Sequence, residues 1–155
     1  MQLSLVAVGK LRPVLREVCD DYLRRLGRFI RVAEREVREA GRAGTERLQR
    51  DTEGTRLLDG ITDGTPVVLL DIDGAGWSSE QLAQQLDRWR LDAKELTIVI
   101  GGAAGVSAAV RRRAQATWSL GPLTLPHELA RVLVVEQLYR ASTILRGEPY
   151  HKGAR

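Results

Sequence analysis

Hydrophobic and polar positions change period along the first 60 residues, and this change predicts alternating strands and helices. Residues 2–9 alternate and then run apolar into a glycine, a pattern typical of a strand that ends in a turn. Pro13 opens a helix, and apolar residues recur at helical spacing over 14–29. Residues 30–38 alternate with charges, which indicates a strand at a sheet edge, and 45–59 are predicted as a polar helix.

The second half of the chain is more hydrophobic. Residues 65–72 form a nearly continuous apolar run, as expected for a central parallel strand covered on both faces. Ser78 or Ser79 is predicted to cap the following helix. Another strand, 95–100, runs into the glycine turn 101–105. Strands and helices therefore alternate, which predicts an α/β domain with a parallel sheet and right-handed crossovers.

The last predicted elements are a short helix over 107–116, a brief strand over 118–120 and a long helix over 127–145. In the long helix, apolar residues at 132–135 point in every direction around the axis. A terminal helix that packs one face on its own sheet exposes the opposite face. We therefore expect this helix to be buried against a second copy of the chain in a homodimer.

Composition bounds the class of protein. A length of 155 residues fits one domain, 1–155, and leaves little room for a second. The net charge of +4 permits an anionic partner such as RNA, and Arg111–Arg113 is a local basic run, although a solvated helix face is the more frequent explanation of such a run. Cys19 is the only cysteine, so no intrachain disulfide forms, and we interpret it as core packing rather than a nucleophile. No segment reaches the ~18 apolar residues of a membrane span, so we expect a cytoplasmic protein.

Two segments have the character of a nucleotide-binding site. The turn Gly101–Gly105 follows a buried strand and precedes a helix, so a ligand can approach its bare backbone. A glycine turn of this kind is also found where it only lets the chain change direction between strand and helix. The loop Leu120–Pro126 offers backbone amides and carbonyls beside apolar side chains. That combination suits an adenine ring, and a buried connector is the alternative.

A pair of aspartates suggests a different chemistry. Asp71 and Asp73, followed by Gly74, resemble the nucleophile and acid of haloacid dehalogenase-type phosphatases, which hold Mg²⁺ between two carboxylates. In that family the motif lies near the start of the domain and continues with threonine, where this chain has Ala75. A convincing downstream acidic pair is also missing. A phosphatase is therefore a minor alternative to a simple strand-end turn, and we expect no metal site.

The C-terminal segment carries polar side chains suited to RNA. Tyr150 can stack on a base, His151 can exchange a proton near neutral pH, and Lys152 can meet a phosphate. A frayed terminus is the alternative interpretation. His127 is equally well explained as a polar residue at the start of a helix.

Taken in order, the motifs resemble those of one family over nearly the whole chain. The set closely resembles the RlmH family of ribosomal RNA methyltransferases. It comprises Leu5-Val-Ala-Val-Gly-Lys10, Tyr22-Leu-Arg-Arg25, Leu69-Leu-Asp-Ile72, Ile100-Gly-Gly-x-x-Gly105, Leu120-x-x-Leu-Thr-Leu-Pro-His127, Arg131-Val-Leu-Val-Val-Glu-Gln-Leu-Tyr-Arg140 and Arg146-Gly-Glu-Pro-Tyr-His-Lys152.

The resemblance implies a fold and an activity. RlmH proteins are SPOUT methyltransferases, α/β proteins with a C-terminal trefoil knot whose homodimers bind S-adenosylmethionine in the knot. They methylate N3 of pseudouridine 1915 in 23S ribosomal RNA. Carried over by motif, the cofactor site comprises Leu70, Gly101, Leu120, Gly121, Pro122, Leu123, Thr124 and Leu125. The residues matched to RNA and the target base are Arg140, Tyr150, His151 and Lys152, and in a dimer they are expected to serve the partner's cofactor.

Two departures from the family pattern stand out. Ala103 and Ala104 replace the more usual polar or acidic filling of the glycine turn, so backbone contacts alone are expected there. The chain also continues through 153–155, beyond the typical end.

The resemblance also suggests a mechanism. We expect His151 to assist deprotonation of N3, Tyr150 to position the ring and Arg140 to stabilise the developing anion. The assembled ribosome is the expected substrate, because so short a chain has few elements for selecting RNA alone. The main rival is a non-catalytic, ribosome-associated RNA-binding factor.

Overall fold

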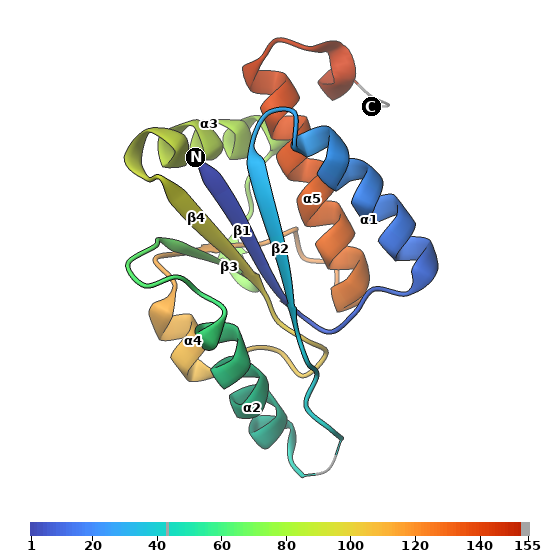
Figure 1. Cartoon of the computed structure of the whole chain (residues 1–155), viewed down its shortest axis with the longest axis vertical. Coiled ribbons are helices and arrows are strands. Elements are labelled where there is room, and N and C mark those ends of the chain that lie inside the picture. The colour runs from blue at the N-terminus through green and yellow to red at the C-terminus, as the bar shows by residue number, and fades with distance from the viewer. Residues whose placement is uncertain (43, 153–155) are drawn as a thin grey trace.

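Five parallel strands form a sheet in the order β2-β1-β4-β3-β5 (Figure 1). The computed structural model describes residues 1–42 and 44–152, so the extension at 153–155 lies outside the described residues. The strands are β1 (Gln2–Val8), β2 (Arg31–Val37), β3 (Val67–Ala75), β4 (Glu95–Ile100) and β5 (Ala116–Trp118). The helices are α1 (Pro13–Leu26), α2 (Glu46–Asp59), α3 (Ser79–Asp92), α4 (Ala108–Arg113) and α5 (His127–Leu145), followed by the 3₁₀ helix η1 (Pro149–Lys152).

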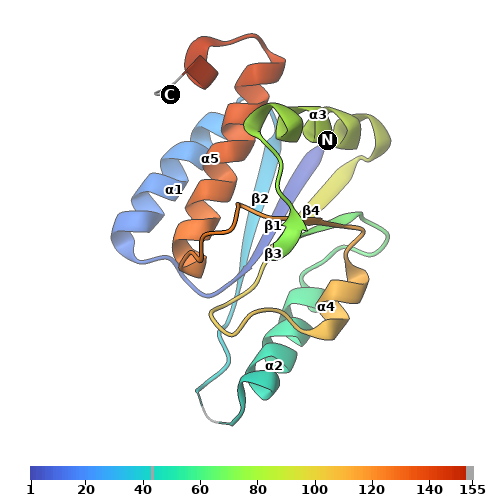
Figure 2. The ribbon, with the colours of Figure 1, turned by 180° about the vertical axis from the view of Figure 1, so that it is seen from behind.

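Helices cover both faces of the sheet, and this arrangement confirms the predicted α/β class. Helices α1, α3 and α5 lie on one face, and α2 and α4 lie on the other (Figures 1 and 2). The alternation in β1 produces two cores. Leu3 and Leu5 pack into the larger core with α1, α3 and α5, whereas Val6 and Val8 pack into the smaller core with α2 and α4.

The edge position of β2 was predicted correctly, and a buried arginine explains how this strand carries acidic residues. Arg131 of α5 is 1% exposed and donates hydrogen bonds from its guanidinium to Glu34 and Glu36 of β2. Its Nη2 also donates to the backbone oxygens of Val8, at 3.2 Å, and Gly9, at 2.8 Å. Inward-facing charges protect an edge strand from pairing with another sheet, and here they also fix α5 to the end of β1.

Strand β3 differs from its prediction as a central strand covered on both faces. It pairs with β4 only over 67–69, and β5 is its other neighbour. After Leu70 the strand separates from β4, and Ile72 is 57% exposed. The pairing with β5 shifts register between Leu70 and Ala75, both of which pair with Trp118. The apolar run therefore marks a strand that is buried only in its first half.

Most other predicted elements occur with shifted ends. Ser78, rather than Ser79, caps α3, and it forms a capping box with Gln81. Helix α1 ends at Leu26, and Gly27, which the sequence predicts at the end of this helix, closes its last turn. Helix α4 is shorter than predicted, and β5 occupies 116–118 rather than 118–120, since Trp118 is the buried end of that strand.

The predicted reason for dimerisation was wrong, because α5 is covered by its own chain. Helix α5 lies on the sheet between α1 and α3 (Figures 1 and 2). Val132, Val134 and Val135 are all buried within the protomer. Three neighbouring elements therefore account for apolar residues around most of this helix, and a second subunit is not needed to bury them.

The single cysteine behaves as predicted. Cys19 is fully buried in the larger core, and burial raises the pKa of its thiol to about 11. The thiol therefore stays protonated at neutral pH and serves as core packing. Over residues 1–42 and 44–152, none of the helices has the length and apolar character needed to cross a membrane.

Replacing Gly74 with alanine is expected to destabilise the protein where β3 crosses β5. A Cβ atom at this position would lie 2.7 Å from the backbone carbonyl carbon of Thr117 and from Trp118 N, and backbone atoms cannot move aside cheaply. We expect the free energy of unfolding to fall by about 1 to 3 kcal/mol, as for other overpacked sites. Urea denaturation measures this change.

Gly76→Ala is the matched control, because a Cβ atom there meets nothing within 4 Å. Equal stability of the Gly74→Ala and Gly76→Ala variants would contradict the close packing of β3 on β5.

Candidate functional site

A cleft of about 320 Å³ opens where β3 separates from β4. Its walls come from three segments: residues 70–72 of β3, beyond the last pairing of this strand with β4, residues 100–106 at and after the end of β4, and residues 120–125 after β5. The start of α5 closes it with His127 and Ala130. In an open parallel sheet, ligands bind at this edge, in a crevice where neighbouring connections diverge.

Most of the residues predicted to bind the cofactor line this cleft. They are Leu70, Gly101, Leu120, Gly121, Leu123, Thr124 and Leu125. Pro122 is absent from the lining, and its ring is exposed. The loop turns sharply at Gly121, where φ is +114°, and Ser119 fixes the turn by accepting a hydrogen bond from Gly121 N at 3.1 Å. This sharp turn brings Leu120 and Leu123 to the same cleft while Pro122 faces solvent.

The glycine turn is packed so tightly that side chains do not fit. A Cβ atom at Gly101 would lie 2.6 Å from Val106 Cγ1 and 3.1 Å from the Gly105 oxygen. At Gly102 it would lie 3.0 Å from Oε1 of Glu53, a buried residue of α2. The turn closes through a hydrogen bond of 3.0 Å from Gly105 N to Gly102 O. Ala103 and Ala104, the departure from the family pattern, do not line the cleft, so its wall here is mainly backbone.

An ion pair and a histidine–glutamate contact border the otherwise largely apolar cleft. Arg111 of α4 pairs with Asp71 in the middle of β3. His127 lies with its Nε2 3.4 Å from Oε1 of Glu39, so it contributes to the cleft as well as beginning α5. The phosphatase alternative is not supported, because the Asp71 carboxylate is taken up by Arg111. Within residues 1–42 and 44–152, no three histidine, cysteine or acidic side chains gather as a metal site would require.

The C-terminal segment is folded rather than frayed. The Tyr150 hydroxyl hydrogen-bonds with Glu136 Oε1 at 3.0 Å and with the Tyr22 hydroxyl at 3.1 Å. Its ring packs against Tyr139 at 4.6 Å between centroids, and the Arg140 guanidinium lies 4.8 Å from the Tyr150 ring centroid. Arg140 also donates to Glu136, at 2.7 and 3.1 Å.

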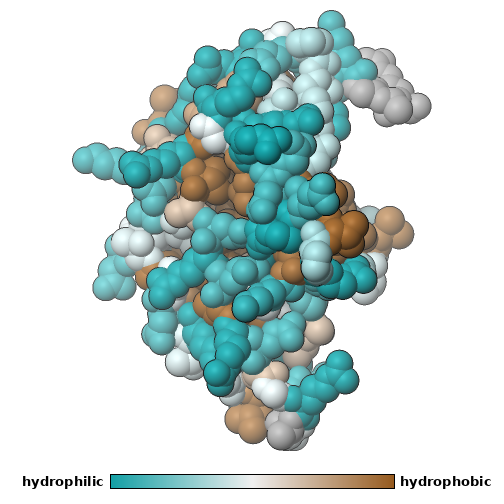
Figure 3. Space-filling view, turned by 45° about the vertical axis from the view of Figure 1, so that its right-hand side comes forward, coloured by the Kyte–Doolittle hydropathy of each residue, from teal (hydrophilic) through white to brown (hydrophobic). Residues whose placement is uncertain are grey.

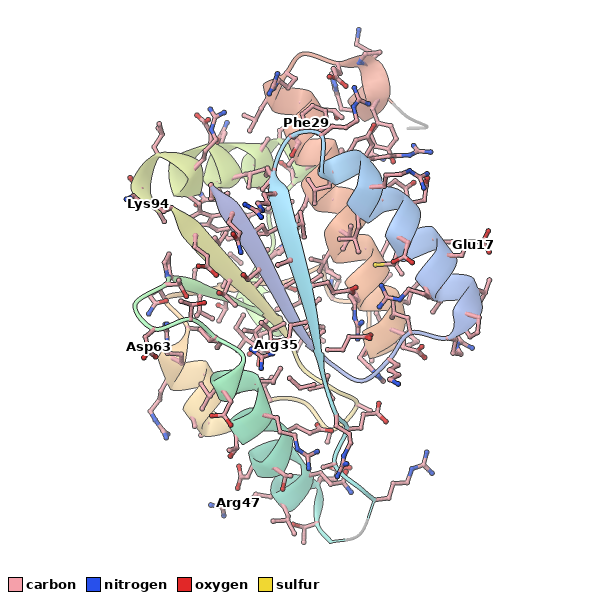
Figure 4. All side chains as sticks on the ribbon, in the orientation of Figure 1. Glu17, Phe29, Arg35, Arg47, Asp63 and Lys94 are labelled. Atoms are coloured by element: carbon pink, nitrogen blue, oxygen red, sulfur yellow. The ribbon has the colours of Figure 1, made fainter. Side chains whose placement is uncertain are left out.

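An arginine near the end of α5 adds to this packing. The Arg146 guanidinium lies 5.6 Å from the ring centroid of Phe29, which is labelled in Figure 4 at the turn between α1 and β2. Arg146 and Tyr150 therefore both hold the end of the chain described by the structure against the protomer.

These contacts give the two aromatic side chains of the segment different proton chemistry. Burial and the hydrogen bonds to Tyr22 and Glu136 raise the pKa of Tyr150, so its phenol keeps its proton at neutral pH. His151 Nδ1 lies 2.6 Å from the Glu148 carbonyl oxygen. A carbonyl oxygen only accepts, so Nδ1 carries the proton and Nε2 of the neutral ring has a free lone pair. Of these two, His151 is therefore the side chain able to take up a proton.

The structure does not bring the C-terminal residues to the cleft of the same chain. Arg140, Tyr150, His151 and Lys152 do not line it. Helix α5 separates the C-terminal residues from the cleft. His127, in the first turn of α5, borders the cleft, whereas η1 follows the opposite end of the helix. Its 19 residues span roughly 28 Å at 1.5 Å per residue. Within one protomer, the predicted cofactor residues and the predicted base-contacting residues are therefore two separate sites.

Several lining residues were not predicted as ligand contacts, notably Arg111, Asp71, Val106 and Ala130. Asp71 directly follows Leu70, which was predicted as a cofactor contact, so its neighbour was the available signal. Arg111 carried a weaker one, because it belongs to the basic run 111–113 on the helix that follows the glycine turn.

A parallel sheet with this cleft at its carboxyl edge defines an α/β protein of the nucleoside-binding class. Comparison with known proteins narrows the class. The chain belongs to the SPOUT methyltransferase family: the family described as "Predicted SPOUT methyltransferase" matches residues 1–151.

Similar proteins support the same family. Proteins named "Ribosomal RNA large subunit methyltransferase H" from Pseudomonas paraeruginosa and Pseudomonas putida are each 44% identical over 156 residues, covering 98% of this chain and 100% of theirs. Among solved structures, a methyltransferase from Bordetella pertussis superposes with a TM-score of 0.55 at 16% identity, over 91% of this chain and 96% of that one. A Legionella pneumophila methyltransferase in complex with S-adenosylmethionine gives 0.51 at 13% identity, over 91% and 66%. At these low identities, the two similarities show a shared fold and nothing further.

Proposed function

We propose that this chain is an S-adenosylmethionine-dependent methyltransferase that modifies N3 of a pseudouridine in 23S ribosomal RNA. The main structural support is that seven of the eight predicted cofactor residues line one cleft. The 44% identity to proteins named ribosomal RNA large subunit methyltransferase H supports the reaction class. The predicted trefoil knot is part of this proposal, and it fits the cleft's construction from three successive strand ends.

The cleft suits the proposed cofactor. Its volume of about 320 Å³ lies within the usual range for small-molecule sites. Apolar side chains such as Ile100, Leu120 and Leu125 would enclose the adenine, and the bare backbone at Gly101 would lie against the sugar. When bound, S-adenosylmethionine supplies an electrophilic methyl group on its sulfonium.

The active form would be a homodimer in which each cleft receives the C-terminal segment of the partner. The separation of the cleft from the C-terminal residues along α5 supports this arrangement. Apolar side chains on the α1 side of the molecule offer an interface: Val14 is 64% exposed and Val18 is 41% exposed, and Leu129, on the first turn of α5, is 37% exposed. Figure 3 shows hydrophobic surface interrupting the hydrophilic surface on this side.

The C-terminal residues would act on the target base. His151 Nε2 would accept the N3 proton, so that the nitrogen keeps its lone pair as the nucleophile. The cofactor would supply the methyl group and would be left as a neutral thioether. Arg140 would stabilise the developing anion on the base. Tyr150, held by Tyr139 and Glu136, would place His151 and orient the base. Lys152, which is exposed, would meet a phosphate.

The expected substrate is the assembled ribosome, and the expected compartment is the cytoplasm. A net charge of +4 gives a chain of this size only modest attraction for RNA, so shape complementarity to a folded particle would supply the remaining selectivity. Transfer of a labelled methyl group into ribosomes, large subunits and free RNA, followed by mapping of the modified nucleotide, tests both substrate and position. Binding of the particles without any methyl transfer or cofactor binding would support the non-catalytic alternative.

His151→Ala is expected to slow single-turnover methylation by about 100-fold or more, because general base catalysis commonly contributes 10²- to 10⁴-fold. Added imidazole should restore part of the rate, since it returns a base without repairing any other contact. Cofactor affinity should change little, because the proposed role of His151 is to accept a proton from the target base rather than to bind the cofactor. A full single-turnover rate in the His151→Ala variant would remove the proposed base.

A further inference from the structure

We propose that Arg111, held in place by Asp71, binds the carboxylate of the cofactor's methionine moiety. The inference rests on the proposed function, because it assigns a ligand group to one part of the cofactor cleft. It adds a cationic side chain from α4 to a site that is otherwise made of strand ends and loops.

Asp71 positions Arg111 without using up its hydrogen-bonding capacity. The guanidinium Nη1 pairs with Oδ2 of Asp71, whose side chain is 6% exposed. Oδ1 of the same carboxylate accepts the backbone N–H of Asp73 at 3.3 Å, so both carboxylate oxygens are engaged. The Arg111 side chain remains 47% exposed and lines the cleft, and a guanidinium carries five N–H donors. Donors that Asp71 does not use are therefore available to a ligand.

The neighbouring arginines face elsewhere, so the run 111–113 is not one phosphate-binding patch. Arg113 donates from Nη2 to the Thr65 backbone oxygen at 2.7 Å and from Nη1 to Gln115 Oε1 at 3.4 Å, which ties α4 to the start of β3 and β5. Arg112 is exposed and does not line the cleft. Successive helical residues point about 100° apart, and Arg111 is the member of the run that meets the cleft.

The charges around the cleft favour this end for an anionic group. His127 is the other lining side chain able to carry a positive charge, but its Nε2 already faces Oε1 of Glu39 at 3.4 Å, whereas the Arg111 guanidinium keeps N–H donors that Asp71 does not use. The remaining walls are mainly apolar and suit the adenine. A carboxylate removed from water needs a charged or hydrogen-bonding partner. A guanidinium offers two parallel N–H groups to it, and Arg111 is fixed before the ligand arrives.

Decarboxylated S-adenosylmethionine provides a direct test, because it keeps the adenosine, sulfonium and amine but lacks the carboxylate. Calorimetric titration of both compounds compares wild type, Arg111→Met, Arg111→Lys and the control Arg112→Met. We expect Arg111→Met to weaken binding of S-adenosylmethionine by about 10- to 100-fold, the range of a charge-assisted hydrogen bond, and to leave binding of the decarboxylated compound unchanged or tighter. Arg111→Lys should recover part of the loss, and Arg112→Met should match wild type.

Each other outcome overturns the assignment in a recognisable way. Equal weakening of both compounds in Arg111→Met indicates a structural role for the Asp71 pair. Unchanged binding of both, with slower methylation of ribosomes, indicates an RNA phosphate contact instead. If wild type binds both compounds equally, the carboxylate has no partner in the cleft, although the proposed function stands. If wild type binds neither, the cofactor site itself fails, and the Arg111 assignment fails with it.

Discussion

Gly101→Val is expected to abolish detectable methyl transfer and to eliminate measurable binding of S-adenosylmethionine. A single Cβ atom at this position would already lie 2.6 Å from Val106 Cγ1 and 3.1 Å from the Gly105 oxygen, and valine adds two further methyl groups. The turn and Val106 both line the cleft, so relief of this overlap displaces its wall. A misplacement of about 1 Å near reacting groups costs on the order of 100-fold in rate, and the loss here should exceed that. Calorimetric titration and a labelled-methyl assay measure the two effects.

Gly41→Val is the matched control, since a Cβ atom at Gly41 meets nothing within 4 Å and the residue does not line the cleft. Circular dichroism checks that both variants keep their helices and strands. Near-normal cofactor affinity in a folded Gly101→Val variant would show that this cleft is not the cofactor site.

An equimolar mixture of Gly101→Val and His151→Ala chains is expected to regain about a quarter of the wild-type activity, although each variant alone is nearly inactive. In a dimer with shared sites, the intact cleft of the His151→Ala chain receives the intact C-terminal segment of the Gly101→Val chain. One of the two sites in each mixed dimer is then complete, and random pairing makes about half of all dimers mixed. A methylation assay after joint refolding or co-expression measures the recovery.

The reason for expecting shared sites is the distance along α5 between His127, which borders the cleft, and the segment that carries His151. As a control, the double variant with both substitutions in one chain should give no recovery when it is mixed with either single variant. With Gly101→Val no dimer has an intact cleft, and with His151→Ala no dimer has an intact C-terminal segment. Absence of recovery, with mixed dimers demonstrated by mass, would mean that each site is completed within one chain.

The element pattern was largely predictable from sequence, because hydrophobic periodicity is a local signal. The strand at 95–100 and the helix at 127–145 have the predicted bounds. The long-range facts were less predictable. The run 65–72 has the composition of a central strand, but its pairing partners are decided elsewhere, and only its first half lies between two strands. Likewise, apolar positions around α5 indicate burial without saying whether α1 and α3 or a second chain supplies it.

The candidate site shows the same division between local and long-range information. Resemblance by motif placed Gly101 and the 120–125 loop, because those residues carry recognisable backbone requirements. Pro122 belongs to the same motif but faces solvent, since the positive φ of Gly121 turns the chain just before it. The pairing of Arg111 with Asp71 could not be read from sequence, because it joins α4 to the middle of β3 through space. The His151 ring had a predicted role, but the hydrogen bond that leaves its Nε2 without a proton depends on the folded 3₁₀ turn.

The length of α5 has a consequence for which changes of sequence this chain tolerates. Each residue inserted into an α-helix advances everything after it by 1.5 Å and rotates it by about 100°. An insertion within 127–145 would therefore swing Tyr150 away from Tyr22 and Glu136, and it would also turn buried valines away from the sheet. Point substitutions at the few exposed positions of α5, Leu129 and Leu145, leave this spacing intact. Among natural or engineered variants, these positions should accordingly accept substitutions far more readily than α5 accepts insertions or deletions.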